Sequence, residues 1–227
     1  MQINPIGYIY TDFKEKFGIP RQSGRVSKLT GKIVFTDEYK NSEALRGIEE
    51  FSHLWIIFGF SENENKRKVV TVRPPRLGGN KRIGVFASRA PYRPNSLGLS
   101  VVKLEKIENE AGNGEVLIVS GVDMLDGTPI YDIKPYLPYA DCICGATGSY
   151  GEENKDYSVK VVFPEELINK FPSDKREALI ECLKEDPRPS YHNDSRTYVM
   201  NYAGFDIQFS VQENILTVTN VKNDKKR

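Results

Sequence analysis

The sequence has few cysteines and no long apolar run, and both absences restrict what the protein can be. It contains three cysteines in 227 residues, too few for the disulfide framework of a small extracellular domain. No apolar run approaches the roughly 20 residues that a membrane-spanning helix needs. The first residues, MQINPIGYIY, lack the basic and then apolar order of a signal peptide. We therefore expect a folded cytoplasmic protein that does not enter a membrane.

Common functional motifs are missing as well. Neither Gly-x-Gly-x-x-Gly nor Gly-x-x-x-x-Gly-Lys-Ser/Thr occurs, so neither common glycine-rich nucleotide cradle is predicted. Cys142 and Cys144 form a Cys-x-Cys pair, but a zinc site needs four ligands at characteristic spacing, and we predict no bound metal. The sequence gives little support for a serine hydrolase. His53 lies in the apolar segment FSHLWII, where a packed or hydrogen-bonded histidine is at least as common as a general base.

Acidic residues are absent from one long segment. Residues 65–104 contain no Asp or Glu but ten Lys or Arg, whereas the whole chain has a net charge of only +1. The rest of the chain therefore carries a net charge of −9. A basic segment of this length attracts polyanions and is typical of nucleic-acid binding. The ten basic residues are Lys66, Arg67, Lys68, Arg73, Arg76, Lys81, Arg82, Arg89, Arg93 and Lys103.

Short apolar runs separated by turn residues dominate the first two thirds of the chain. They are rich in Val, Ile, Phe and Tyr, as strands are, and only residues 41–51 interrupt them with helical character. Strands without intervening helices of 10–15 residues argue against parallel β-α-β units and favour a compact antiparallel β-barrel. The predicted strands lie within residues 6–10, 31–35, 53–60, 68–72, 82–88, 99–107 and 115–122.

The composition changes near residue 145. Residues 145–158, GATGSYGEENKDYS, have little apolar content and predict a linker. A strand at 159–163 and helical sequence from about 164 to 184 follow, and the last forty residues predict strands with turns at 203–204 and 213–214. We therefore expect a mainly β protein with a small α+β C-terminal domain. The predicted division is residues 1–145, a linker at 146–158, and residues 159–227.

Four loops rich in glycine or proline carry polar groups at the expected strand ends. Proline limits the backbone freedom that binding would remove, so these loops are suited to binding. Arginine offers a planar fork for phosphate or carboxylate, and a tyrosine beside it suits an unstacked base. The loops are FGIPRQSG (17–24), VRPPRLGGNKR (72–82), ASRAPYRPNSLG (87–98) and GVDMLDGTPIYDIKPYLPYAD (121–141).

Together these loops closely resemble the TrmO (YaeB) family of S-adenosylmethionine-dependent methyltransferases, which act on N6-threonylcarbamoyladenosine in tRNA. The resemblance runs through nearly the whole chain in the same order. One departure is Ser96, where the family usually has a second proline after Arg-Pro-Asn, a change that we expect to loosen the loop. The matching segments are FKEKFGIPRQ, ALRGIEEFSHLWIIFGF, VRPPRLGGNKRIGVFASR, RPNSLGLS, LDGTPIYDIKPYLPYAD and DPRPSY.

This resemblance implies a β-barrel methyltransferase that modifies position 37 in the tRNA anticodon loop. It also implies a homodimer with cofactor sites near the subunit interface and a C-terminal domain that helps to hold tRNA. The cofactor contacts that it implies are Pro20, Arg21, Gln22, Phe60, Arg89, Leu97, Asp126, Gly127 and Thr128.

The chemistry of the reaction sets further expectations. Methyl transfer to nitrogen mainly needs alignment of the reactants, and the weakly nucleophilic acceptor nitrogen must lose its proton. Its base is not identified by the sequence, and His53 and Asp123 are the candidates. The threonyl carboxylate and the phosphates require cationic partners. The tRNA contacts that we expect are Arg73, Arg76, Tyr92, Arg93 and Lys134.

Two alternative functions remain open at this point. A non-catalytic RNA-binding barrel would use the same basic loops and aromatic residues without any cofactor, and its RNA binding would be salt-sensitive. A small-molecule methyltransferase would keep the cofactor but close its pocket around another acceptor. The length of the basic segment argues against a small acceptor.

Overall fold

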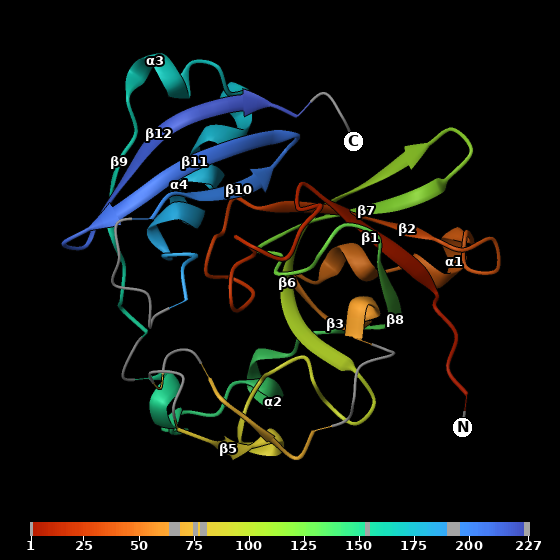
Figure 1. Cartoon of the computed structure of the whole chain (residues 1–227). Coiled ribbons are helices and arrows are strands. Elements are labelled where there is room, and N and C mark those ends of the chain that lie inside the picture. The colour runs from red at the N-terminus through yellow and green to blue at the C-terminus, as the bar shows by residue number, and fades with distance from the viewer. Residues whose placement is uncertain are drawn as a thin grey trace.

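The structure is a computed structural model, which describes residues 2–63, 69–74, 77, 81–152, 155–189 and 196–224. Its largest element is a closed antiparallel barrel with the strand order β1-β2-β7-β6-β3-β8 (Figure 1). The mainly β fold with an antiparallel barrel, predicted from the sequence, is confirmed. The barrel strands are β1 (Gly7–Thr11), β2 (Thr30–Phe35), β3 (His53–Gly59), β6 (Leu97–Glu110), β7 (Gly114–Ser120) and β8 (Thr128–Pro135).

The barrel interior follows from alternation along the strands. Ile9 on β1, Ile33 on β2, and Leu54 and Ile56 on β3 are fully buried, and residues two apart on a strand point to the same face. Branched aliphatic side chains suit such a pleated, enclosed surface. The barrel is therefore filled by side chains.

The C-terminal part contains a second sheet with the strand order β10-β11-β12-β9. Its two hairpins turn at 203–204 and 213–214, as the sequence predicts. All four turn residues have positive φ, between 46° and 77°, the conformation of the two-residue turns that match strand twist. The strands are β9 (Lys160–Val162), β10 (Tyr198–Tyr202), β11 (Phe205–Gln212) and β12 (Ile215–Asn223).

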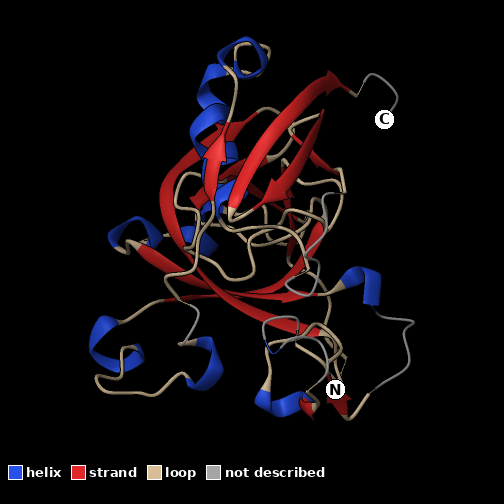
Figure 2. Cartoon of the chain, turned by 60° about the vertical axis from the view of Figure 1, so that its left-hand side comes forward, coloured by secondary structure: helices blue, strands red, loops and turns tan. Residues whose placement is uncertain are grey.

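The helices are short and lie beside the strands (Figure 2). The predicted helical sequence from 164 to 184 forms two short α-helices with a 3₁₀ turn between them. None of the helices in the described ranges is long and apolar enough to span a membrane. The helices are α1 (Ser42–Leu45), α2 (Pro138–Asp141), α3 (Glu165–Ile168) and α4 (Arg176–Lys184), with 3₁₀ turns η1 (Ile48–Glu50), η2 (Ser61–Asn63), η4 (Val85–Ala87), η5 (Ser149–Gly151) and η6 (Ser173–Lys175).

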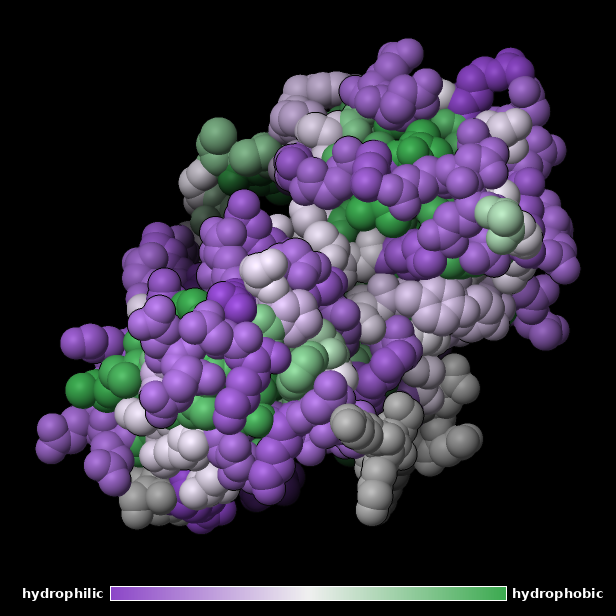
Figure 3. Space-filling model, turned by 90° about the horizontal axis from the view of Figure 1, so that it is seen from above, coloured by the Kyte–Doolittle hydropathy of each residue, from purple (hydrophilic) through white to green (hydrophobic). Residues whose placement is uncertain are grey.

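A small two-stranded sheet of β4 (Thr71–Val72) and β5 (Ile83–Gly84) belongs to the connection between β3 and β6. It lies at the opposite end of the molecule from the C-terminal sheet (Figure 1). Hydrophilic residues cover most of the face seen in Figure 3, and hydrophobic ones show there only as patches between them.

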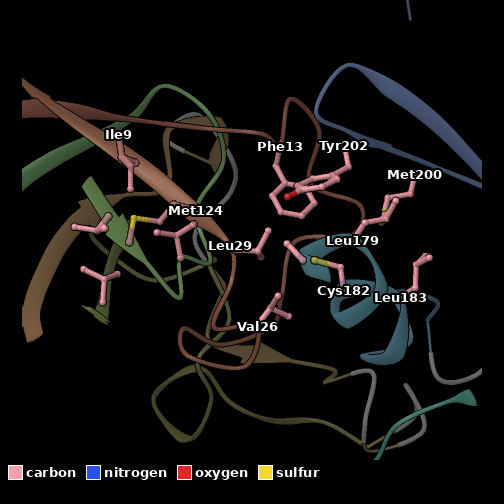
Figure 4. Packing of buried hydrophobic residues seen from close by; sticks show 14 of the residues in the cluster. Ile9, Phe13, Val26, Leu29, Met124, Leu179, Cys182, Leu183, Met200 and Tyr202 are labelled. Carbon is pink, nitrogen blue, oxygen red and sulfur yellow. The ribbon is translucent and has the colours of Figure 1, made fainter. Parts of the chain in front are cut away.

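The connection between β1 and β2, residues 12–29, joins the barrel to the C-terminal sheet. The ring of Phe13 lies 5.0 Å from that of Tyr202 on β10, and Val26 and Leu29 lie between the barrel and α4 (Figure 4). The backbone N–H of Ala203 donates to the carbonyl of Asp12 at 2.9 Å. Buried hydrophobic residues therefore form one continuous cluster across both parts, and the division into two domains remains a prediction.

One glycine allows this close contact. Gly18 has a φ of +100°, and a Cβ there would lie 2.2 Å from the Sδ of Met200 on β10. A side chain at residue 18 would therefore clash with Met200. It would also require a backbone conformation that residues other than glycine rarely adopt.

Replacing Phe13 by alanine should lower the free energy of unfolding by about 3–5 kcal/mol, since it empties a fully buried aromatic site. Chemical denaturation measures the change. Tyr139→Ala is the control, because that side chain is 87% exposed and should change stability by no more than about 0.5 kcal/mol. A loss below about 1 kcal/mol for Phe13→Ala would contradict the proposed packing.

Candidate binding site at the barrel mouth

Three connections between strands leave the barrel at the same end. In an antiparallel pair the carboxyl end of one strand adjoins the amino end of its neighbour. Gly59, at the end of β3, pairs with Leu97 at the start of β6, and Ile9, near the end of β1, pairs with Thr128 at the start of β8. We call this end the barrel mouth. The connections that meet there are residues 12–29, 60–96 and 121–127.

A cavity of about 710 Å³ opens at the barrel mouth. Its walls come from all three connections and from the adjoining ends of β3, β6 and β8. Seven of the nine residues that the resemblance implies as cofactor contacts line this cavity. Those seven are Pro20, Arg21, Gln22, Phe60, Arg89, Leu97 and Thr128.

The other two, Asp126 and Gly127, do not line the cavity. One carboxylate oxygen of Asp126 accepts from the backbone N–H of Thr11 at 2.9 Å, and the other pairs with Lys14. Gly127 donates its N–H to the carbonyl of Ile9 at 2.9 Å. Both residues therefore fasten the connection between β7 and β8 to β1. Asp126 faces a separate hollow of about 540 Å³, which Lys14, Lys32 and Lys175 also line.

Aromatic side chains form an apolar wall that the sequence reasoning missed in part. Phe58 lines the cavity beside Phe60, with ring centroids 5.1 Å apart and the rings inclined by 71°. Opposite Phe58 on β6 is Gly98, where a Cβ would lie 2.3 Å from the Phe58 ring. Gly98 therefore leaves the space that this ring occupies. The alternation within HLWIIFGF indicates which residues share a face with Phe58, but not that its ring reaches the mouth.

Cationic side chains surround the entrance. Arg89 donates to the carbonyl of Leu99 at 3.5 Å, and Arg93 donates to the carbonyl of Ser88 at 2.7 Å. Lys16 pairs with Glu62 at 3.0 Å. Because Arg21 lines the same cavity, three guanidinium groups lie at a site suited to a carboxylate or a phosphate.

Asp123 supplies a buried acceptor in the cavity wall. Its Oδ1 is buried and has no hydrogen-bond partner among the described residues. Burial raises the pKa of this carboxyl above its usual 3.8, although a hydrogen bond with Ser100 and the charge of Arg89 oppose the shift. A buried acceptor without a partner is unfavourable unless a ligand supplies the donor. Asp123 is therefore suited to accept a proton or a hydrogen bond from a bound molecule.

His53, the other candidate base, lies at the opposite end of β3. It is six residues before Gly59, which places it about 20 Å away at the rise of an extended strand. Its ring contacts Tyr136, and its Nδ1 lies 2.9 Å from the Ser52 hydroxyl. The structure brings Asp123, and not His53, to the cavity.

The expected tRNA contacts are distributed more widely. Arg93 lines the cavity, and Tyr92 is exposed beside it. Arg73 is exposed next to β4, whereas Lys134 is exposed on β8, about 20 Å along the strand from Thr128. Arg76 lies outside the described residues, as do Lys66, Arg67 and Lys68 of the basic segment.

Ser96 closes the turn at the entrance. Its φ is +51°, its N–H donates to the carbonyl of Arg93 at 3.1 Å, and its carbonyl accepts from Phe60 at 2.8 Å. Proline could neither adopt this φ nor donate a hydrogen bond. The turn therefore has a geometry that proline at residue 96 could not adopt, so this part of the chain depends on the serine.

Two family models match the chain over most of its length. The model described as the tRNA-methyltransferase O N-terminal domain matches residues 8–142. The TrmO C-terminal domain matches residues 156–224. The first match covers all of the barrel strands except Gly7 and includes the barrel mouth, and the second contains the C-terminal sheet.

Individual relatives and solved structures agree with these matches. A protein of Escherichia coli (strain K12) named tRNA (adenine(37)-N6)-methyltransferase is 38% identical over 93% of this chain and 94% of its own length. A Pseudomonas aeruginosa relative, whose name describes an S-adenosylmethionine-dependent methyltransferase, is 41% identical over 83% of this chain and 82% of its own. The crystal structure of TrmO from Pseudomonas aeruginosa superposes with a TM-score of 0.78 at 32% identity, over 98% of each chain.

Proposed function

Because this chain belongs to the tRNA-methyltransferase O family, we propose that it transfers the methyl group of S-adenosylmethionine to N6 of adenine 37 in tRNA. The observation that carries the proposal is the cavity at the barrel mouth. It collects seven residues at which the family resemblance implies cofactor contacts and adds a buried carboxylate, Asp123.

The residues of the cavity fit this cofactor. The volume of about 710 Å³ lies within the range of about 300–1,000 Å³ for small-molecule sites. Phe58 and Phe60 offer an apolar wall for a planar base, and Arg21 and Arg89 offer partners for a carboxylate. When bound, the cofactor supplies a methyl group activated by a positively charged sulfur.

We further propose N6-threonylcarbamoyladenosine as the acceptor. Its threonyl carboxylate would pair with Arg93, which lines the cavity next to the exposed Tyr92. Arg73, Arg76 and Lys134 would contact phosphates of the tRNA, with Lys134 about 20 Å along β8 from Thr128 at the cavity. The C-terminal domain, predicted from residue 159 onward, would support the tRNA beside residues 12–29, on which the C-terminal sheet packs.

Asp123 is the proposed base. Its ionised carboxylate accepts the proton from N6 of the acceptor, and the freed nitrogen electron pair forms the new N–C bond. The bound cofactor would supply the methyl group, and the electron pair of its carbon–sulfur bond would stay on the departing sulfur. The arginines hold the reactants in line for this step, which accounts for much of the acceleration in such transfers.

We also propose that the protein is a cytoplasmic homodimer. Val70 and Phe86 are 83% and 78% exposed, and the backbone N–H of Val85 donates to the carbonyl of Val70 at 3.0 Å. Phe86 lies in η4, two and three residues before Ser88 and Arg89 of the cavity wall, and Val70 directly precedes β4. An interface there would adjoin the cavity.

Purified protein mixed with methyl-labelled S-adenosylmethionine and tRNA from cells that lack this gene should yield a nucleoside one methyl heavier than N6-threonylcarbamoyladenosine. Nucleoside mass spectrometry detects it. Labelling of another nucleoside would refute the proposed acceptor. If the protein binds tRNA but transfers no methyl group, it is an RNA-binding barrel, and labelling of small molecules alone would indicate the other alternative.

Asp123→Asn should lower the rate of methyl transfer by about 10²–10⁴-fold, as expected for loss of a general base. It should leave the melting temperature unchanged or higher. Burial raises the pKa of Asp123 in the folded state above its unfolded value. The contribution of Asp123 to the free energy of unfolding is therefore favourable below the unfolded pKa and is lost as the pH rises through the folded pKa. At neutral pH its replacement by asparagine removes no stabilising contribution.

The wild-type rate should in turn fall as the solution is acidified through this raised pKa. Asp132→Asn is the control, since Asp132 is exposed on β8 and lies outside the cavity wall. If Asp123→Asn transfers methyl groups within tenfold of the wild-type rate, Asp123 is not the base.

Light scattering coupled to size-exclusion chromatography should give the mass of two chains for the wild-type protein. Phe86→Asp should shift the protein toward the mass of one chain, because a charge would be buried in the interface. Val199→Asp, on the outer side of the C-terminal sheet, should leave the dimer intact. A one-chain mass for the wild-type protein would rule out the dimer.

A further inference from the structure

The chain leaves helix α4 through a strained turn, Glu185–Arg188. Asp186 has a φ of +49° and stands before Pro187, a position where proline strongly restricts the backbone. Its N–H donates to the carbonyl of Leu183 at 3.1 Å, which closes the last turn of the helix. Such strain persists only where the surroundings hold it.

A buried ion pair holds this turn from within. Nε of Arg188 donates to Oδ1 of Asp186 at 2.8 Å, and Nη2 donates to Oδ2 at 2.9 Å. The hydroxyl of Tyr157 donates to the same Oδ2 at 2.9 Å. The two charged side chains are only 12% and 6% exposed. Arginine suits this place because its planar fork meets both carboxylate oxygens at once.

The turn is also bonded to the loop that forms one wall of the cavity. Nη2 of Arg21 donates to the carbonyl of Asp186 at 3.3 Å and to that of Arg188 at 3.0 Å. Four residues further along the loop, Arg25 makes a bidentate ion pair with Glu185, with N···O distances of 3.0 and 2.7 Å. Two arginines of the loop are thus attached to one turn of the C-terminal part.

We propose that the turn Glu185–Arg188 is a positioning element of the methyl-transfer site, which fixes the side chain of Arg21 at the cavity wall. This inference rests on the proposed function, because Arg21 matters only if the cavity holds the cofactor. The carbonyls that receive Arg21 keep their places because the Asp186–Arg188 pair locks the turn. A long, flexible side chain that is already oriented loses less freedom when a ligand binds.

The inference assigns a role to the C-terminal part that does not require contact with tRNA. Arg188 acts on the cofactor through Arg21 and does not line the cavity itself. Loss of the lock should therefore weaken cofactor binding even when tRNA is absent. A role in tRNA binding alone would leave cofactor binding unchanged.

The test uses Arg188→Lys, which keeps the charge but cannot make both bonds to Asp186. Isothermal titration with S-adenosylhomocysteine, without tRNA, should show a dissociation constant about tenfold higher than for the wild-type protein. Arg176→Lys is the matched control. Arg176 belongs to the same part of the chain and donates to the carbonyl of Phe171 at 2.9 Å, but it lies outside the cavity wall.

A double-mutant cycle separates positioning from a general loss of stability. If Arg188 acts through Arg21, adding Arg188→Lys to Arg21→Ala should change the dissociation constant no further. If Arg188→Lys does not fold, Tyr157→Phe replaces it, because this change removes a single hydrogen bond to Asp186. We then expect a smaller rise in the dissociation constant. That rise should disappear when Tyr157→Phe is combined with Arg21→Ala. Unchanged binding in the folded variant, or additive effects in the cycle, would overturn the inference.

The same titration separates this inference from the proposed function. A wild-type protein that does not bind S-adenosylhomocysteine refutes the proposed cofactor site and the inference together. A wild-type protein that binds it and methylates tRNA, combined with an additive cycle, refutes only the role of the turn.

Discussion

The aromatic contact between Phe13 and Tyr202 is the constraint on which the rest of the site depends. It fastens the connection between β1 and β2 to the C-terminal sheet, and Gly18 lets the chain pass directly over Met200. The same connection then reaches the cavity with Pro20, Arg21 and Gln22. A cavity wall is therefore supplied by a barrel loop whose position is set by a different sheet. Packing, and not the barrel alone, determines the shape of the site.

Strand pairing determines the other walls. Since β3 pairs with both β6 and β8 in antiparallel fashion, the end of one strand adjoins the starts of the other two. Phe58 lies on β3 and Phe60 directly follows it, Leu97 begins β6, and Thr128 begins β8. Charge is added by the segment without acidic residues, which contributes Arg89 and Arg93. The result is an apolar wall beside guanidinium groups and one buried carboxylate, a combination suited to a ligand with a planar base and charged ends.

Much of this arrangement could be predicted from the sequence. Alternating apolar residues predict the strands, and pairs such as Ala203–Gly204 predict hairpin turns because their left-handed conformations match strand twist. The residues of the loops predict a site with arginine and an acidic partner. Long motifs such as VRPPRLGGNKRIGVFASR predict the family, which the family models confirm.

The rest depends on contacts between distant segments. Nothing in FKEKFGIPRQ indicates that Phe13 packs on β10, because the partner lies near the other end of the chain. His53 and Asp123 are equally plausible as bases until strand length places the histidine at the far end of β3. Asp126 resembles a ligand contact in sequence, but in the structure it bonds to Thr11 and Lys14. The attachment of Arg21 to two carbonyls has no sequence signal at all, because any residue can supply a carbonyl.

A crystal structure of the protein with S-adenosylhomocysteine would show where the ligand binds. We expect the ligand in the cavity at the barrel mouth, between residues 19–22 and the adjoining ends of β3 and β6, with Asp123 in its wall. Arg21 should keep its bonds to the carbonyls of Asp186 and Arg188. A ligand in the hollow lined by Lys14, Lys32 and Lys175, or elsewhere on the barrel, would rule out the cavity at the barrel mouth as the cofactor site.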